Sequence, residues 1–144
     1  MWPSPRFRRT LDTFLQLHPE VLVLVLGMRD IELDSGRWAN RIVPCYGLPV
    51  PTAMEIVGYS DLFLGIDSCM LHAADFFGVP GVGLFGPTDY NVWGFKYAKH
   101  RHVTGNGVMQ TIEVQDVIDA LEDLWQTCRI PLGCTPRRED SIRA

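Results

Sequence analysis

Apolar positions along the chain fall into two patterns, continuous runs and repeats at intervals of three and four. The continuous runs are typical of parallel strands covered on both faces, and they occupy residues 21–26, 61–66 and 81–85. The repeats predict helices over residues 10–17, 51–57, 70–77 and 112–125. Less regular segments predict a short helix or loop over residues 30–40, a brief strand over 41–43, and a glycine-, histidine- and lysine-rich loop that ends near 107.

The order of these elements predicts the fold class. Strand and helix alternate throughout, and crossover connections between parallel strands are almost always right-handed. This order is typical of an α/β domain built on a doubly wound parallel sheet of the Rossmann-like type. In such sheets ligands bind at the carboxyl ends of the strands.

The composition is that of a soluble globular domain. The chain has 144 residues, of which 47% are hydrophobic, and a formal charge of −4. No apolar run approaches the roughly 20 residues that span a bilayer, and no short apolar segment follows a basic N-terminus, so we expect a cytoplasmic protein. Because the body of the chain is acidic and the excess of arginine lies at its two ends, nucleic acid is not an expected partner.

Cysteines and histidines form no metal-binding pattern. The four cysteines contain no Cys-x-x-Cys pair, and we interpret them as free thiols: Cys45, Cys69, Cys128 and Cys134. His100 and His102 have no neighbours that would complete a metal site, and we interpret them as solvated loop residues. Two basic clusters could contact an anion, although solvated surface is the simpler interpretation of both: Lys96, Lys99 and Arg101, and Arg6, Arg8 and Arg9.

The predicted strand-to-helix turn at Asp67 and Ser68 is the strongest candidate for a ligand site. A helix that starts there leaves the backbone N–H groups of residues 69–71 unpaired, and such groups attract an anion. His72 lies one helical turn later on the same face and can reach the same phosphate. Taken alone, Asp67 or Ser68 could equally be a plain N-cap, and His72 a half-buried structural histidine.

A second turn, Gly86-Pro87-Thr88-Asp89, follows the next predicted strand. The carboxyl ends of neighbouring parallel strands lie at one edge of a sheet, so both turns would face the same space. Without a ligand, the same four residues are also a good turn sequence. The combination of the two turns is more specific than either turn alone.

The residues of both turns, with the helix between them, resemble the C-terminal half of the heptosyltransferases, glycosyltransferase family nine. The resemblance extends from Trp2-Pro3 to the last predicted helix, about 125 residues. The matching positions are Asp67, Ser68 and His72 of the family pattern D-[ST]-G-x-x-H, Gly78 and Pro80 of a helix end A-x-x-G-x-P, and the complete G-P-T-D of Gly86, Pro87, Thr88 and Asp89.

This resemblance implies a GT-B glycosyltransferase, in which two Rossmann-like domains face each other and the C-terminal one holds the nucleotide-sugar donor. Residues 1–127 would form that domain without its first strand, and residues 128–144 a polar tail. The donor would be a nucleotide-diphosphate sugar such as ADP-heptose. Transfer would proceed with inversion, without a metal or other cofactor, to lipopolysaccharide or another glycan at the inner face of the cytoplasmic membrane. The donor-binding residues would be Asp67, Ser68, Cys69, His72, Gly86, Pro87, Thr88 and Asp89.

Two departures from the family pattern bear on activity. Cys69 replaces a glycine that lets the backbone approach the phosphate closely, so its side chain is expected to crowd the donor. The family's N-terminal domain, which supplies the acceptor site and the catalytic base, is missing from this sequence, so no catalytic residue is assigned and the chain alone is expected to be inactive. The alternative is a non-catalytic nucleotide-binding or chain-pairing module, which would join the missing half or a second copy through an exposed sheet edge.

Overall fold

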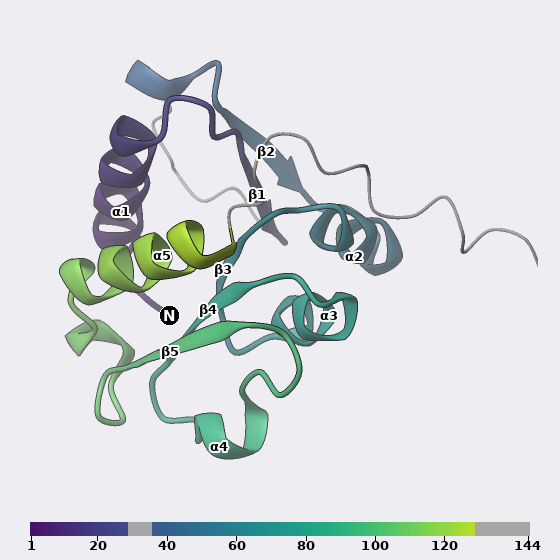
Figure 1. The fold of residues 1–144 in the computed structure, drawn as a ribbon, viewed down its shortest axis with the longest axis vertical. Helices are drawn as coiled ribbons and strands as arrows, with labels where there is room; N and C mark the ends of the chain where they lie inside the picture. The colour runs from purple at the N-terminus through teal and green to yellow at the C-terminus, as the bar shows by residue number, and fades with distance from the viewer. Residues whose placement is uncertain (29–35, 129–144) are drawn as a thin grey trace, which may run out of the picture.

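The computed structural model describes residues 1–28 and 36–128, and it has parallel strands between two layers of helices (Figure 1). Along the chain the elements are α1 (Ser4–Leu17), β1 (Val23–Gly27), β2 (Ile42–Tyr46), α2 (Val50–Gly58), β3 (Phe63–Ile66), α3 (Cys69–Phe77), β4 (Gly81–Phe85), α4 (Tyr90–Trp93), β5 (His100–Thr104) and α5 (Val114–Cys128). Two 3₁₀ turns, Gly36–Trp38 and Met109–Thr111, precede β2 and α5. Every predicted helix and strand is present, and α1 begins earlier than its apolar pattern indicates.

The strands of the described residues pair in two separate parallel groups. β1 pairs with β2, with Val23 opposite Ile42. β3, β4 and β5 pair in that order, with Phe63 opposite Gly81 and Gly81 opposite His100. The predicted parallel α/β class is confirmed, and the break between β1 and β3 divides the sheet in two.

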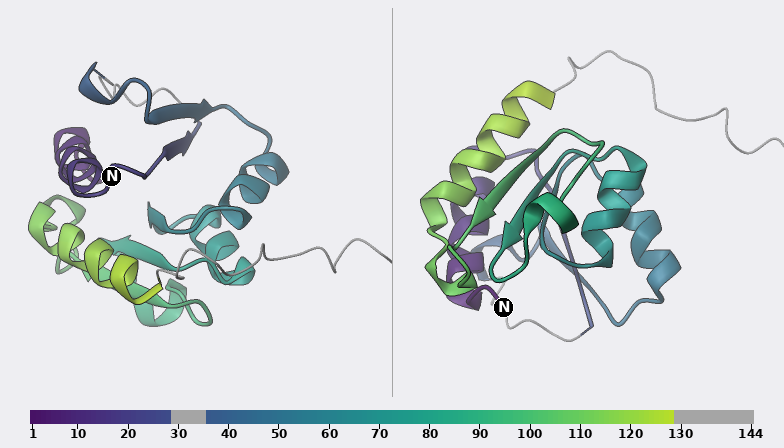
Figure 2. Two further views of the ribbon diagram at one scale, coloured as in Figure 1. Left: turned by 45° about the horizontal axis from the view of Figure 1, so that its top comes forward. Right: turned by 90° about the horizontal axis from the view of Figure 1, so that it is seen from below.

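Helices cover both faces of the strands. α1 and α5 pack together on one face, and α2 and α3 pack together on the other, as Figures 1 and 2 show. β4 lies at the centre of its group and is buried at every position. Val82 and Leu84 join the core cluster beneath α1 and α5, whereas Phe85 joins the cluster beneath α2 and α3. A strand with both faces covered needs apolar residues on both, which explains the uninterrupted apolar run.

The N-terminal segment is anchored at the start of α5. Trp2 Nε1 donates a hydrogen bond of 3.1 Å to the carbonyl oxygen of Ile112, and Arg6 donates to the same oxygen. Near the other end of α1, His18 Nε2 lies 2.6 Å from a carboxylate oxygen of Glu122. α1 and α5 therefore run side by side in the same direction. The interpretation of Arg6 as solvated surface is wrong, because its guanidinium joins two elements.

The segment after β4 differs from the predicted loop. It contains α4 and the strand β5, to which His100 and His102 belong. Their rings stack with centroids 4.6 Å apart, and Phe95 stacks on both. The prediction of solvated loop histidines was wrong, because imidazole rings take the place of aliphatic side chains on one face of this strand.

Three further expectations concern thiols, metals and membranes. Cys45, Cys69 and Cys128 are free thiols, as predicted. Across residues 1–28 and 36–128, no three His, Cys, Asp or Glu side chains are grouped to hold a metal ion, and no helix is long and apolar enough to cross a bilayer. Cys134 and nearly all of the predicted tail lie outside the described residues, as does most of the predicted helix or loop before β2.

Candidate functional site

Two strand-to-helix turns leave the three-stranded group at its carboxyl edge. β3 ends at Ile66 and β4 ends at Phe85, and their parallel register sets Ile66 beside Leu84. The turns that follow, residues 67–68 and 86–89, therefore emerge next to each other. This is the arrangement that the parallel topology predicts for the two motifs.

The first turn of α3 offers backbone donors that the described chain does not use. Ser68 occupies the N-cap position in an extended conformation, but its side chain makes no capping hydrogen bond. Its carbonyl oxygen accepts from the N–H groups of Leu71 and His72 at 3.1 and 3.4 Å. The N–H groups of Cys69 and Met70 have no acceptor among the described residues. Because a helix N-terminus also carries a partial positive charge, this turn is suited to an anion.

The side chains around this turn are open to a ligand. Asp67 and Ser68 are half-buried, whereas Cys69 and His72 are exposed. Within residues 1–28 and 36–128, no hydrogen bond or ion pair engages the side chains of Asp67, Ser68 or His72. The structure therefore does not use Ser68 as a side-chain cap, and the crowding of a donor by Cys69 stays a prediction.

The second turn is more fully engaged within the chain. Asp89 caps α4: one carboxylate oxygen accepts from the backbone N–H of Asn91 at 2.8 Å and from its side-chain amide at 3.0 Å. Gly86 is buried, and a Cβ there would lie 2.9 Å from a backbone nitrogen of the 3₁₀ turn before α5. Pro87 is exposed and Thr88 is half-buried. A turn that needs no ligand is thus sufficient to explain Asp89 and Gly86, but not Thr88.

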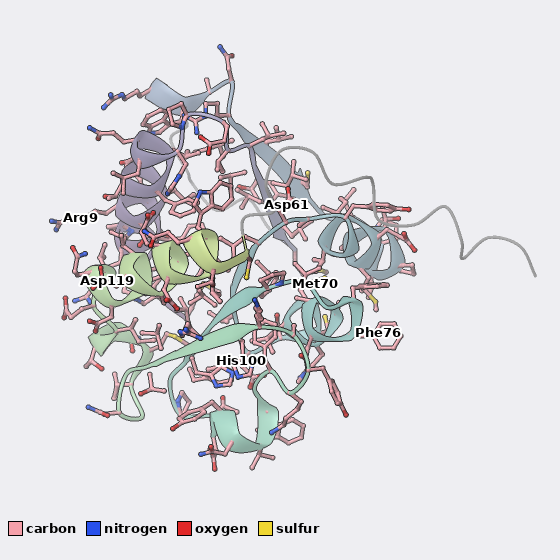
Figure 3. The ribbon with its side chains drawn as sticks, in the orientation of Figure 1. Arg9, Asp61, Met70, Phe76, His100 and Asp119 are labelled. Carbon is pink, nitrogen blue, oxygen red and sulfur yellow. The ribbon has the colours of Figure 1, made fainter. Side chains whose placement is uncertain are left out.

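A buried carboxylate that the sequence analysis missed secures the segment between α4 and β5. Asp75 on α3 is 7% exposed and accepts hydrogen bonds of 2.8 Å from the backbone N–H groups of Lys96, Tyr97 and Ala98. Burial acts to raise the pKa of Asp75, but the three donors together lower it by more, so the pKa lies below its usual value. The neighbouring Phe76 points away from the strands (Figure 3). The one acidic residue on the mostly apolar helix α3 was the signal that could have revealed these hydrogen bonds.

A histidine supports the same segment from β5. His102 Nε2 accepts a hydrogen bond of 3.1 Å from the backbone N–H of Phe95, so the neutral ring carries its proton on Nδ1. Burial, followed by the positive charges of His100 and Lys96, lowers the pKa of His102 to about 4. Asp75 and His102 therefore hold residues 95–98 against α3 and β5, directly after α4 and the second turn.

Two surface hollows lie apart from the predicted site residues. The first, of about 260 Å³, is lined by Arg8, Asp12, Gln16, Gly36, Arg37 and Trp38. The second, of about 570 Å³, lies over residues 96–101 and two side chains of α5. Around it, Arg101 is ion-paired with Asp123, and Lys96 donates to the carbonyl oxygen of Asn91. These two cations are therefore engaged within the chain.

Comparison with known proteins identifies the fold. No family model matches the sequence, and no curated protein matches it significantly. Among solved structures, the chain is similar to the glycosyl transferase family 9 from Veillonella parvula DSM 2008, with a TM-score of 0.73 and 20% identity. It is also similar to the E. coli ADP-heptose LPS heptosyltransferase II, with a TM-score of 0.73 and 19% identity. A third similar structure is the E. coli heptosyltransferase WaaC with ADP, with a TM-score of 0.72 and 12% identity.

Each of these similarities covers most of this chain and less than half of the other protein. The matches span 88%, 88% and 85% of this chain but only 42%, 42% and 39% of the Veillonella protein, heptosyltransferase II and WaaC. The chain therefore has the fold of one part of a GT-B heptosyltransferase, as the resemblance implies. At these identities the similarity establishes the fold and leaves the chemistry to the residues of the site.

Proposed function

We propose that this chain is the C-terminal, donor-binding part of a heptosyltransferase-like glycosyltransferase, and that it binds the diphosphate of a nucleotide sugar at the start of α3. The observation that carries the proposal is the first turn of α3, where the N–H groups of Cys69 and Met70 and the Ser68 hydroxyl have no hydrogen-bond partner among the described residues. Parallel α/β sheets bind ligands outside this edge. The adjoining turn supplies the hydroxyl of Thr88, with Gly86, Pro87 and Asp89 shaping the space around it.

Each residue of the first turn has a role that suits a diphosphate. The N–H groups of Cys69 and Met70 donate to phosphate oxygens, and the Ser68 hydroxyl adds another donor. His72 donates from one helical turn away, while Asp67 accepts from hydroxyls of the sugar. The helix N-terminus, equivalent to about half a positive charge, acts with the imidazole to stabilise the departing nucleoside diphosphate without a metal ion.

The names of two similar structures support a particular donor and acceptor in this proposal. WaaC is described with ADP, and heptosyltransferase II is named for ADP-heptose and lipopolysaccharide. We therefore propose an ADP-linked sugar as the donor and lipopolysaccharide, or another glycan at the inner face of the cytoplasmic membrane, as the acceptor. The base that deprotonates the acceptor belongs to the part of the fold that this chain does not span. The expected activity of the chain alone is donor binding without transfer.

Calorimetry and thermal unfolding of the full chain with ADP-, UDP-, GDP- and CMP-sugars test this proposal. A ligand at 100 times its Kd raises the free energy of unfolding by about 2.7 kcal/mol, which is a measurable rise in melting temperature. We expect the ADP-linked sugars to stabilise the chain most, and to the same extent in EDTA and in Mg²⁺. Stabilisation by none of these ligands would overturn the proposal.

Variants separate the turn from the rest of the surface. Ser68→Ala and His72→Ala should each weaken donor binding about tenfold, the effect of losing one charge-assisted hydrogen bond. Gln126→Ala, an exposed change on α5, is the matched control and should leave binding unchanged. Cys69→Gly should tighten binding, and unchanged affinity would show that this side chain does not limit access. Full affinity in the double variant of Ser68 and His72 would place the donor elsewhere.

A further inference from the structure

The two turns of the candidate site are connected a second time, away from the site itself. The first turn begins α3, and the second turn, residues 86–89, leads into α4. Asp75 in the last turn of α3 accepts hydrogen bonds from the backbone N–H groups of the segment that follows α4, residues 96–98. The far end of α3 is therefore bonded to the segment that ends α4.

His102 on β5 contacts α4 at its start and just past its end (Figure 1). Its ring centroid lies 5.2 Å from that of Tyr90, the first residue of α4. Its Nε2 accepts the hydrogen bond of 3.1 Å from the backbone N–H of Phe95. Between these contacts, a Cβ at Gly94 would lie 2.6 Å from two atoms of the His102 ring, so the backbone passes directly against the imidazole.

The second turn of the site is attached to α4 without a spacer. Asp89, the last residue of the turn, is the N-cap of α4, and Thr88 precedes it. Tyr90 also packs on Phe85, the last residue of β4, with ring centroids 6.2 Å apart. The turn thus leaves a buried strand and enters a helix that is held from both β5 and α3. Loss of the Asp89 cap alone would leave these contacts in place.

Side chains, and not a backbone ladder, set the path of the segment after α4. The successive backbone N–H groups of residues 95–98 all donate to His102 or Asp75. The role at position 102 needs a nitrogen without a proton, and the low pKa of His102 keeps the ring neutral at neutral pH. The role at position 75 needs a carboxylate, and the three donors lower the pKa of Asp75 accordingly. An apolar side chain of similar shape cannot replace either acceptor.

We propose, on the basis of the donor site proposed above, that Asp75 and His102 are positioning residues of that site. They hold α4, and with it the hydroxyl of Thr88, where the second turn contacts the same diphosphate as the first turn of α3. Asp75 lies about two turns along α3 from Ser68, roughly 10 Å at 1.5 Å per residue. Both residues therefore act through the backbone that they hold, and a site whose supporting bonds are lost has to be ordered when the donor binds.

The test compares variants that keep or remove the acceptors, with ADP as the probe of the diphosphate site and calorimetry as the measurement. His102→Gln keeps an acceptor for the Phe95 N–H, whereas His102→Phe keeps an aromatic ring and removes the acceptor. Asp75→Asn keeps one acceptor oxygen and turns the other into a donor. His102→Phe and Asp75→Asn should each weaken ADP binding about fivefold, the effect of losing one neutral hydrogen bond, and His102→Gln should weaken it less than about twofold.

A double variant separates positioning from a general loss of structure. Thr88→Ala alone should weaken ADP binding about as much as His102→Phe alone. Adding His102→Phe to Thr88→Ala should weaken it no further, because both changes remove the same contact with the diphosphate.

Amide hydrogen exchange by NMR follows the same residues without ligand. The N–H of Asn91 is bonded to the N-cap of α4, and its exchange should become at least tenfold faster in His102→Phe and Asp75→Asn. The N–H of Leu71 is bonded within the first turn of α3, and its exchange should change much less.

Leu121→Ala is the matched control, since Leu121 is 3% exposed on α5 and its truncation lowers the melting temperature through lost burial. It should leave ADP affinity unchanged, as well as the exchange of Asn91 relative to Leu71.

Three outcomes would overturn the positioning role. Full ADP affinity in His102→Phe and Asp75→Asn would mean that the second turn needs neither residue. Additive losses in the double variant with Thr88→Ala would mean that His102 does not act through Thr88. An equal loss of affinity in Leu121→Ala would mean that binding follows overall stability. If the unsubstituted chain binds neither ADP nor an ADP-linked sugar, the donor site is wrong, and the exchange of Asn91 still decides whether the two residues hold α4.

Discussion

The three-stranded group (β3, β4 and β5) and the two-stranded pair (β1 and β2) differ in how completely their side chains are buried and their strand edges are paired. β4 is buried at all positions, and the segment before β5 is held by Asp75 and His102. In the pair, Leu24 is 40% exposed, and within residues 1–28 and 36–128 no strand pairs with the edge of β1 that faces β3. The candidate site lies in the three-stranded group, at the ends of β3 and β4. Both turns of the candidate site are therefore formed although the sheet is divided, because both follow strands of the three-stranded group.

The largest expected loss of stability follows from removing the buried carboxylate of Asp75, which holds the segment before β5 in the three-stranded group. Asp75→Ala removes the acceptor of three backbone N–H groups and should lower the free energy of unfolding by about 3–4 kcal/mol. At about 3 °C per kcal/mol, the melting temperature should fall by about 10 °C. Asp75→Asn keeps the shape and one acceptor oxygen, and should lose less.

The control for this variant is Asp119→Ala, another acid, which is exposed on α5 (Figure 3). Its loss should be within about 0.5 kcal/mol, as for most surface substitutions. Equal losses in the two variants, measured by urea unfolding, would show that the hydrogen bonds to Asp75 do not stabilise the fold.

Replacing one leucine in each group by alanine compares directly how much side-chain burial in the two groups contributes to the free energy of unfolding. Leu84 in β4 is 1% exposed, so Leu84→Ala should cost about 3 kcal/mol through lost burial and the cavity that remains. Leu24 in β1 keeps much of its surface in water, so Leu24→Ala should cost about 1 kcal/mol or less. Losses of similar size would show that β1 is covered in solution, as it would be if a strand or a second chain already filled the break.

The sequence predicted the elements whose residues are apolar and missed the strand whose residues are not. The runs over β1, β3 and β4 carry their own signal, because strands covered on both faces need apolar residues throughout. β5 was missed because His100, Arg101 and His102 make it polar, and only the fold brings Phe95 onto the histidine rings.

The candidate site was predictable in outline and not in detail. Parallel topology was sufficient to bring the two turns together, since neighbouring strands end at one edge. Which residue caps its helix was not predictable, because serine and aspartate have similar N-cap preferences. The hydrogen bonds to Asp75 were also not predictable, because the donors lie more than twenty positions along the chain in the segment between α4 and β5.

Lowering the pH should reduce the free energy of unfolding first through His102, which supports the segment before β5 in the three-stranded group. The pKa of His102 is about 4 in the folded chain and about 6.5 when unfolded, so between these values only the unfolded state takes up the proton. The free energy of unfolding should therefore fall as the pH drops from 6.5 toward 4, by no more than about 1.4 kcal/mol per pH unit. Asp75 adds a second loss below about pH 4, because its pKa is lower in the folded state.

His102→Gln, which keeps an acceptor for the Phe95 N–H but does not titrate, should flatten the decline between pH 6.5 and 4 and leave the decline below pH 4. Urea unfolding at half-unit pH intervals measures both windows. An unchanged slope in the upper window would mean that His102 is not the group responsible.

The smallest expected effects distinguish the two turns of the three-stranded group. A substitution in the second turn should lower mainly the free energy of unfolding, whereas a substitution in the first turn should lower mainly the affinity for the donor. Asp89→Ala removes a side-chain cap and should lower the free energy of unfolding by about 1 kcal/mol, with donor affinity changed less than about twofold. Ser68→Ala removes no capping bond, so its loss of stability should be only a few tenths of a kcal/mol, while donor affinity falls about tenfold. If Ser68→Ala destabilises as much as Asp89→Ala, the serine hydroxyl caps α3 in solution, and the free donors on which the proposed diphosphate site depends are already occupied.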